Sequence, residues 1–335
     1  MEIRRLSLAE WDEALPDDGF EVFHTPEALE ALEAHTRGEL RLYGGYKGEQ
    51  PIGLAPVFVR EQAFGTVALS PPPGFGIPRL GPLVMPTSPK QRKRERVNGR
   101  FTEGLLKEFD VDASTTLFRM VCPTSYADPR PFDWSALSVD PTFTYHLPVR
   151  EDTDALLRSF SKSLRREIRD VGEVNCSIEV GDREDIRRIY EQARDRYAEQ
   201  DRSFGLTWPY VRDLTDALSA VDRCLPYVVR DGDGDFVSGI VALYSNDAAY
   251  YWLGGAIATL DGTTVNSALH WRIIRDIAAD EPPTSVDTYD LMGANTERLC
   301  RYKSKFGADL VPYYTVESEG PGMRAAKTAY RLMSR

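Results

Sequence analysis

Apolar side chains recur every four residues in one stretch of the second half of the chain. The positions are Leu156, Phe160, Leu164 and Ile168. This spacing places the four side chains on one face of a helix, because an α-helix completes a turn in 3.6 residues. The intervening positions are mostly basic or polar, as on the solvent face of a helix. The pattern therefore predicts one amphipathic helix across residues 156–168.

Short runs rich in β-branched and aromatic residues lie between the predicted helices and are typical of β-strands. They are residues 40–47, 52–60, 115–121, 144–149, 177–180, 227–230, 236–244, 250–256, 288–292 and 310–316. Further helices are predicted at residues 26–35, 186–197 and 266–279. Because helices and strands alternate along the chain, we expect a mixed α/β or α+β fold with central sheets flanked by helices.

The order of these elements is similar in the two halves: a helix, a hairpin with a glycine-containing turn, a strand, a helix and a strand. This order predicts two copies of one fold. A length of 335 residues also exceeds one typical domain. The Pro/Asp-rich loop at 123–142 is the best candidate boundary. We expect one domain over residues 1–140, a second over 141–320, and a basic helix at 321–335.

The chain is acidic, with a net charge of −11 and a pI of about 5.0. This charge disfavours nonspecific binding of nucleic acid over a broad surface, and we expect no DNA partner. No apolar run approaches the roughly 20 residues of a membrane span. No apolar signal region opens the sequence, so we expect a cytoplasmic protein. The four cysteines and four histidines are scattered and complete no metal-ligand pattern, so we expect no metal.

Residues 287–317 carry the densest candidate chemistry. They include Lys303 and Lys305, two of the chain's eight lysines. These ammonium groups could neutralise a phosphate or stabilise an oxyanion; the alternative is a solvated helix end, where cations are favoured. Asp290 ends a predicted strand and either accepts an amine proton or makes only local hydrogen bonds. Asn295 either caps the next helix or contributes to binding the cofactor.

Other candidates lie outside that segment. Thr264 and Asn266 open a predicted helix and are ordinary cap residues, yet the unpaired N–H groups at such an end can also hold a phosphate. Arg165 and Arg169 lie on a basic helix face, which either binds an anionic substrate or is solvated. Tyr251 could act as a general acid, with aromatic packing as the alternative.

Four successive segments of the second half carry a family resemblance. They are LLRSFSKSLRREIRDVGE, DIRRIYEQARDRYAEQDRSFGLTWPYVRDL, YYWLGGA with NSALHWRIIRDIAA, and YDLMGA with YKSKFGA. In this order they resemble the acyl-CoA N-acyltransferase (GNAT) superfamily, and within it the FemABX peptidyltransferases and their BioF2-like acetyltransferase relatives. The first half matches more loosely, through VFHTPEALEAL and GEQPIGLAPVFV. The resemblance implies two GNAT-like domains in tandem, the first of them degenerate.

The resemblance also implies where an acyl donor binds: between the strands at 250–256 and 288–292, beside Gly254 and Gly255. Lys303 matches the lysine of the family's Lys-x-x-Phe-Gly ending. One departure concerns the loop before the next helix, GGAIATLDGTTVN, which lacks the family's Arg/Gln-x-x-Gly-x-Gly/Ala phosphate loop. This departure weakens the expectation that coenzyme A binds in the usual manner.

Together these features predict an N-acyltransferase that moves an acetyl or other CoA-linked acyl group to an amine. The acceptor class expected is a small molecule or an envelope-glycan precursor. Two alternatives stay open: a FemABX-type peptidyltransferase that uses aminoacyl-tRNA, and a noncatalytic binding protein of the same fold. The acidic charge favours acyl-CoA or another small donor, whereas the missing phosphate loop favours the other interpretations. The sequence leaves the acceptor and the oligomeric state open.

Overall fold

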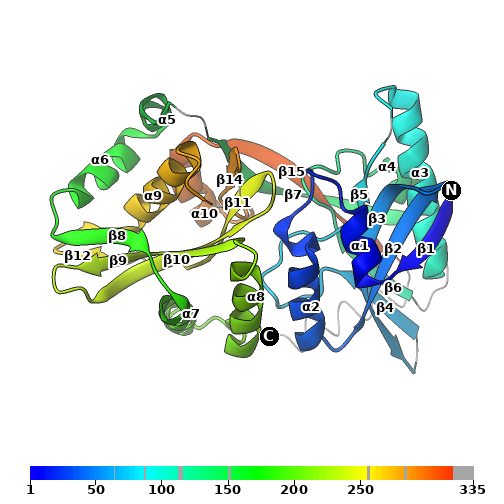
Figure 1. Cartoon of the computed structure of the whole chain (residues 1–335), viewed down its shortest axis with the longest axis horizontal. Coiled ribbons are helices and arrows are strands. Elements are labelled where there is room, and N and C mark those ends of the chain that lie inside the picture. Colours follow the sequence, from blue (N-terminus) through cyan, green and yellow to red (C-terminus); the bar gives the residue numbers. More distant parts are fainter. Residues whose placement is uncertain are drawn as a thin grey trace. The chain divides into compact units, whose positions relative to one another are not determined.

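The chain folds into two units, each containing its own run of mixed β-strands (Figure 1). The computed structural model describes residues 1–63, 65–86, 88–111, 116–149, 152–254, 257–282 and 285–319. Of the described residues, the first unit comprises those within 1–73, 77–142 and 312–319, and the second comprises those within 74–76 and 143–311. The basic helix predicted at 321–335 lies outside the described residues.

The sheet of the first unit has the strand order β1-β2-β3-β4-β6-β15. Its elements are β1 (Glu2–Leu6), α1 (Leu8–Ala14), the 3₁₀ helix η1 (Val22–His24), α2 (Pro26–His35), β2 (Glu39–Lys47), β3 (Gln50–Gln62), β4 (Gly65–Ser70), β5 (Leu83–Val84), α3 (Gln91–Glu108), β6 (Thr116–Val121), α4 (Arg130–Trp134) and β15 (Asp309–Ser318). Neighbouring strands are antiparallel except for the parallel pair β4 and β6. Helix α3 covers one face, where Phe101 and Leu105 join a core with Val57 and Phe118.

The sheet of the second unit has the order β7-β14-β11-β10-β9-β8. Its elements are β7 (Leu137–Pro148), α5 (Thr153–Ser159), α6 (Lys162–Val171), β8 (Cys176–Val180), α7 (Arg183–Ala198), α8 (Trp208–Ser219), β9 (Cys224–Asp231), β10 (Phe236–Tyr244), β11 (Ala248–Gly254), β12 (Thr259–Leu260), β13 (Thr263–Thr264), α9 (Asn266–Ala278), β14 (Thr288–Asp290), α10 (Glu297–Lys303) and the 3₁₀ helix η2 (Ser304–Phe306). The only parallel pair described in this sheet is β11 with β14. The short strands β12 and β13 form a separate hairpin.

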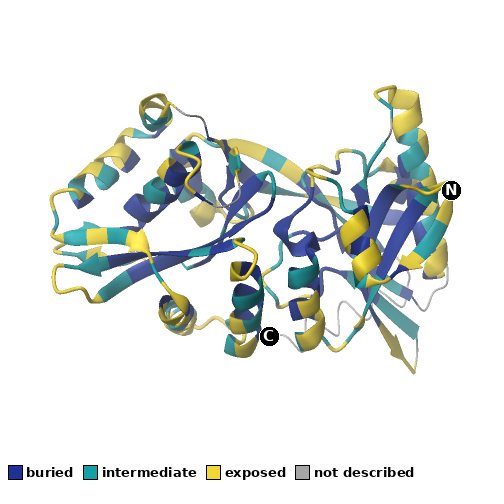
Figure 2. Cartoon of the chain, in the orientation of Figure 1, coloured by how far each residue is buried: buried dark blue, intermediate teal, exposed yellow. Residues whose placement is uncertain are grey.

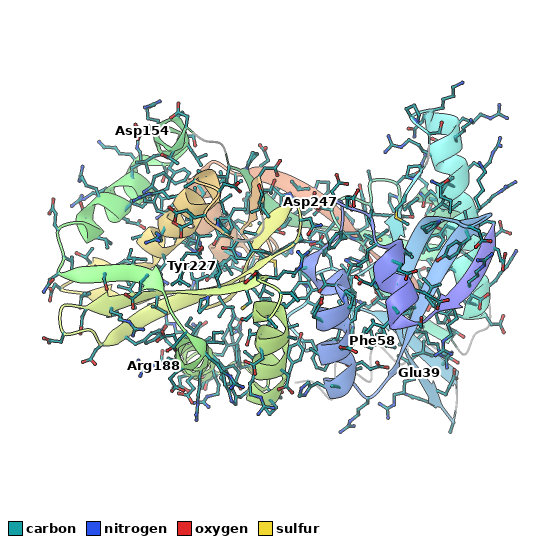
Figure 3. All side chains as sticks on the ribbon, viewed as in Figure 1. Glu39, Phe58, Asp154, Arg188, Tyr227 and Asp247 are labelled. Carbon is teal, nitrogen blue, oxygen red and sulfur yellow. The ribbon has the colours of Figure 1, made fainter. Side chains whose placement is uncertain are left out.

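Helices cover both faces of the second sheet. A side chain added at Gly239 on β10 would meet Ile189 of α7, whereas the next residue, Ile240, belongs to the core formed with Leu269 and Ile273 of α9. Successive residues of a strand face opposite sides, so α7 and α9 lie on opposite faces. Figure 2 shows the strands as mostly buried and the outer sides of the helices as exposed. Tyr227, labelled in Figure 3, lies in this core.

The two units repeat one order of elements. The first runs β1, α1, α2, β2, β3, β4, α3, β6, and the second runs β8, α7, α8, β9, β10, β11, α9, β14. The strand order and the single parallel pair also correspond. The sixth strand of each sheet comes from outside this run: β15 in the first unit and β7 in the second. The prediction of two copies of one mixed fold is confirmed.

One predicted helix is wrong. The apolar stripe from Leu156 to Ile168 belongs to two helices, α5 and α6, because the chain is extended at Phe160 (ψ 152°). Ser161 then caps α6, and its hydroxyl accepts the N–H of Leu164 at 3.2 Å. Serine favours such caps over helix interiors. Phe160 and Leu164 still join the same core, so the spacing identified the buried side chains but not the break.

Candidate active site

The parallel strands β11 and β14 part at one end. They pair only from Ala248 with Thr288 to Tyr250 with Asp290. Beyond this point β11 continues to Gly254 alongside β10. The chain after β14 follows β7 instead, with the N–H of Leu291 donating to the carbonyl of Tyr145 at 2.9 Å. The two strands therefore part beyond Tyr250 and Asp290, in the region where the resemblance places the acyl donor, and Figure 1 shows β11 and β14 as neighbours.

A β-bulge lies on β11 where it leaves β14. Ala242 of β10 pairs with Tyr251 and Val241 pairs with Leu253, so Trp252 is an extra residue. A bulge leaves its extra residue out of the ladder and bends the strand. The indole of Trp252 donates to the carbonyl of Gly76 at 3.1 Å. The bulge thus frees one backbone position of β11 at the edge of the gap.

Asp290 anchors the turn that follows β14. One carboxylate oxygen accepts the hydroxyl of Thr144 and the N–H of Met292, the latter at 2.7 Å. The N–H of Gly293 donates to the same Thr144 hydroxyl at 3.1 Å. Met292 and Gly293 both have positive φ, 57° and 75°, a conformation that costs energy at a methionine and persists when its surroundings hold it. We call residues 290–293 the Met292 turn.

Lys303 holds the other side of the Met292 turn. Its ammonium group donates to the carbonyls of Met292 and Gly293, the second at 3.1 Å. The side chain comes from the end of α10 and the residue is only 4% exposed. Burial lowers the pKa of Lys303 from 10.5 to about 8. The negative charge of Asp290 raises this pKa but does not outweigh the effect of burial. At neutral pH the site therefore still holds a buried positive charge.

Aromatic rings and a neutral histidine surround this ammonium. The Lys303 Nζ lies 5.6 Å from the centre of the Tyr251 ring, and that ring contacts His270 edge to face at 4.7 Å. His270 Nδ1 lies 2.9 Å from the Tyr289 hydroxyl. Burial, and then the charge of Lys303, lower the pKa of His270 to about 3, so the imidazole is neutral and a weak base.

Tyr251 was expected as a general acid. Its hydroxyl donates to the carbonyl of Gly254 at 3.0 Å, and burial raises the pKa of Tyr251 well above 10. A phenol held in this way is a poor proton donor at neutral pH. The ring face towards Lys303 is the part of the side chain that contacts the site.

The start of α9 has no side-chain cap. The cap residue is Val265 rather than Thr264 or Asn266, which corrects the expected assignment. Asn266 is the first helical residue and is 5% exposed. Its Oδ1 accepts the N–H of Ala258 at 3.0 Å, which fixes the amide orientation. Its Nδ2 has no hydrogen-bond partner among the described residues, and such a group is costly to bury unless a ligand satisfies it.

A carboxylate also lies at this helix end. Glu167 of α6 accepts the hydroxyl of Ser267 at 2.6 Å and pairs with the ammonium of Lys305 at 3.0 Å. Lys305, expected to neutralise a phosphate, therefore has an acidic partner. The buried Tyr302 hydroxyl lies near Ser267. It makes no hydrogen bond of acceptable geometry with any described residue. The α9 end thus combines spare buried donors with a nearby anion.

The remaining candidates lie apart from this group. The amide of Asn295 exchanges two hydrogen bonds with the backbone of Phe143 on β7, at 3.0 and 3.2 Å. Asn295 does not cap α10; the cap position is Thr296. Arg165 and Arg169 are exposed on α6: the first donates to the Arg158 carbonyl and the second pairs with Asp170. Gly255 lies outside the described residues.

The structure adds residues that the motifs did not indicate. Thr144 and His146 come from β7, which precedes the matched segments, and His146 Nε2 lies 3.4 Å from Asp290 Oδ2. Glu167 comes from the middle of a helix. The alternation along β7 could have placed Thr144 and His146 on one face, but their partner strand cannot be read from the sequence.

Comparisons with known proteins agree with this geometry. Residues 158–304 match the family model described as an acetyltransferase (GNAT) domain. The second unit is a GNAT domain. This match covers most of the second unit and confirms there the resemblance carried by the four segments. No curated protein matches the chain significantly.

Solved structures share the fold over nearly the whole chain. FemX has a TM-score of 0.68 at 12% identity, covering 94% of this chain and 97% of FemX. A conserved protein of unknown function from Bacteroides thetaiotaomicron has a TM-score of 0.57 at 12% identity, covering 95% and 99%. L-PGS from Bacillus licheniformis has a TM-score of 0.53 at 11% identity, covering 92% and 97%. At these identities the likeness concerns the fold.

Two further findings bear on the chemistry of the GNAT domain and its partner unit. Among the described residues, no group of three or more His, Cys, Asp or Glu side chains is arranged to hold a metal ion. No described helix combines the length and apolar character needed to cross a bilayer.

Proposed function

We propose that the protein transfers an acyl group to an amine at the gap where β11 and β14 part. The observation that carries this proposal is the buried Lys303 ammonium, held by two backbone carbonyls beside that gap. A fixed positive charge in a site with little water stabilises negative charge strongly. Attack of an amine on an acyl carbonyl places such a charge on the carbonyl oxygen.

Lys303 serves as the oxyanion stabiliser in this proposal. Its pKa of about 8 keeps it mostly charged at neutral pH, so it does not act as the base. The carbonyls of Met292 and Gly293 orient two of its three N–H bonds. The third N–H bond is then available to the reacting oxygen. The bulge at Trp252 supplies a backbone position on the opposite side of the gap.

For the donor we propose acyl-CoA, with acetyl-CoA as the simplest case. It supplies a thioester whose carbonyl is open to attack. The α9 end fits a phosphate in two respects: it lacks a side-chain cap, and the buried Asn266 Nδ2 has no partner among the described residues. Helix N-termini favour anions. The ammonium of Lys305 would then exchange its ion pair with Glu167 for one with the phosphate.

A specific observation also favours the second donor class, an aminoacyl-tRNA. Glu167 places a carboxylate at the α9 end, where it repels a pyrophosphate. The exposed outer side of α5 and α6 is basic, with Arg158, Lys162, Arg165, Arg166 and Arg169. Asp170 is the one acidic residue for which ion pairs with this group are described. A basic surface of this kind binds the phosphate backbone of RNA. The acceptor in either case is an amine of a small molecule or an envelope-glycan precursor.

Ligand-dependent stability separates the two donors. The melting temperature of the protein would be measured with acetyl-CoA, longer acyl-CoAs, free CoA and an aminoacyl-tRNA mixture. A ligand at 100 times its Kd stabilises by about 2.7 kcal/mol, which is readily detected. Stabilisation by thioesters supports the CoA donor, and stabilisation by tRNA alone supports the second. Product formation is then followed by mass spectrometry with a panel of amines. The absence of acyl transfer from either donor would contradict the proposal.

A further inference from the structure

His146 and Asp290 form a pair across β7 and β14. The two residues lie opposite each other in the antiparallel register, so their side chains leave the sheet on the same face. His146 Nε2 lies 3.4 Å from Asp290 Oδ2. Asp290 is fully buried, whereas the His146 side chain keeps 21% of its surface exposed. The pair therefore connects a buried carboxylate to an accessible imidazole at the last rung before β14 leaves β11.

The carboxylate of Asp290 is fixed in one orientation. Its Oδ1 is held by the Thr144 hydroxyl and the Met292 N–H, which leaves Oδ2 towards His146. A carboxylate beside Nε2 selects the tautomer with the proton on that nitrogen. Nδ1 then carries the lone pair. At 3.4 Å the two groups are in close contact, and a catalytic hydrogen bond often tightens only in the reacting complex.

The other titratable groups described around the gap are poor proton acceptors. His270 has a pKa of about 3 and lies against Tyr289. Lys303 carries a positive charge at neutral pH. Asp290 is engaged by Thr144 and Met292, with no exposed surface. Among these groups, His146 alone combines a neighbouring carboxylate with access to solvent.

We infer that His146 accepts the proton of the attacking amine and that Asp290 positions it. The inference rests on the proposed amine acylation and adds its base. As the nitrogen–carbon bond forms, one proton of the amine passes to Nδ1 of His146, and the oxyanion develops next to Lys303. The bond from the acyl carbon to the leaving group then breaks, and the imidazolium returns its proton to that group. An amide and the protonated leaving group result.

The test compares histidine variants of the full chain. His146→Ala is expected to lower kcat about 100-fold, within the range of a lost general base, with added imidazole restoring part of it. Asp290→Asn should lower kcat without rescue by imidazole. His35→Gln, at the end of α2 in the first unit, provides the matched control and should keep wild-type activity. If the wild type transfers acyl groups and His146→Ala has the same activity, the inference about His146 is overturned, while the proposed function is not.

A second measurement does not depend on turnover. The chain has four histidines, so their side-chain nitrogen signals can be assigned by NMR with the His146→Gln variant. The expected result is the Nε2–H tautomer for His146 in the wild type and its loss in Asp290→Asn. An Nδ1–H tautomer in the wild type would overturn the dyad, even in a preparation without acyl transfer. Inactivity of the wild type with all donors, together with the expected tautomer, instead counts against the proposed reaction.

Discussion

Asp290 and Lys303 hold the two sides of a single peptide segment. The carboxylate of Asp290 accepts the N–H of Met292, while the ammonium of Lys303 donates to the carbonyl of the same residue. Both groups therefore take their positions from the Met292 turn, whose positive φ angles require such support. A change at either residue should displace the other.

Replacing Lys303 with methionine tests the oxyanion role. Methionine keeps much of the side-chain length but removes the charge. We expect kcat to fall about 100- to 1,000-fold, as for other lost oxyanion donors, with a smaller change in the KM of the amine. Lys107→Met on α3 is the control, because Lys107 is exposed and pairs only with Glu103 among the described residues. Equal kcat values for Lys303→Met and the wild type would show that the ammonium does not act in the chemical step.

The pH dependence of kcat offers a second test. Burial lowers the pKa of Lys303 to about 8, so its charge is present below this pH and is lost above it. Activity that depends on the charge should therefore decline as pH rises through about 8. In Lys303→Arg the guanidinium stays charged, so the alkaline decline should disappear even if kcat is lower. An unchanged decline in that variant would assign it to another group.

Stability should respond to pH in the opposite direction. The pKa of Lys303 is 10.5 in the unfolded chain and about 8 in the fold. Between these values the unfolded state binds more protons, so the free energy of unfolding rises with pH. The full stability is therefore reached above pH 10.5, and the part of it that depends on neutral Lys303 is lost as the pH falls through about 8.

The difference between the two pKa values corresponds to roughly 3 kcal/mol. Lys303→Met avoids the cost of burying a charge but leaves two carbonyls without their donor. We expect it to be more stable than the wild type by about 1 kcal/mol at pH 7, and less stable above pH 10. Urea unfolding at several pH values measures the difference. A constant difference across this range would contradict the lowered pKa.

The sequence predicted the fold better than it predicted the site. Periodic apolar positions and the repeated order of elements identified both copies, because these patterns reflect burial. The motif also led to Lys303. Asp290 and Lys303 lie in one short segment, and their proximity follows from a local turn.

What the sequence did not predict depends on contacts between distant segments. Thr144 and His146 approach Asp290 only because β7 pairs with β14. Thr144 and Asp290 are 146 residues apart in the chain. Glu167 reaches Ser267 across a separation of 100 residues. The break at Phe160 was missed because the core pattern continues through it. Spacing reports which side chains are buried, and it does not report which strand lies next to which.

Asn266 provides a test of the donor site. Asn266→Asp keeps the oxygen that accepts the Ala258 N–H, but it removes the unpartnered Nδ2 and adds a negative charge. The helix dipole favours an acidic residue at a helix start, but position 266 is buried near Glu167, so the melting temperature of the variant is measured to establish that it folds. Its KM for a phosphate-bearing donor should rise at least tenfold, with little change in kcat at saturation. An unchanged KM would place the donor's phosphates elsewhere.

Gly254 at the end of β11 tests the geometry of the gap. Its φ is +114°, and an added Cβ would lie 2.3 Å from the Gly239 carbonyl oxygen and 3.0 Å from Ile240 Cα. Gly254→Ala must therefore strain the backbone and also push β11 away from β10. We expect a loss of about 3 kcal/mol in stability, from the left-handed conformation and the overlap together.

Gly262 is the matched control, because it has a φ of +79° but no atom within 4 Å of an added Cβ. Gly262→Ala should cost only the backbone term, about 1 kcal/mol. Both values are measured by denaturant unfolding. Equal losses would mean that β11 does not lie against Gly239 as described. A larger loss in Gly254→Ala, accompanied by a raised KM for the acyl donor, would show that the position of this strand end shapes the donor's binding site.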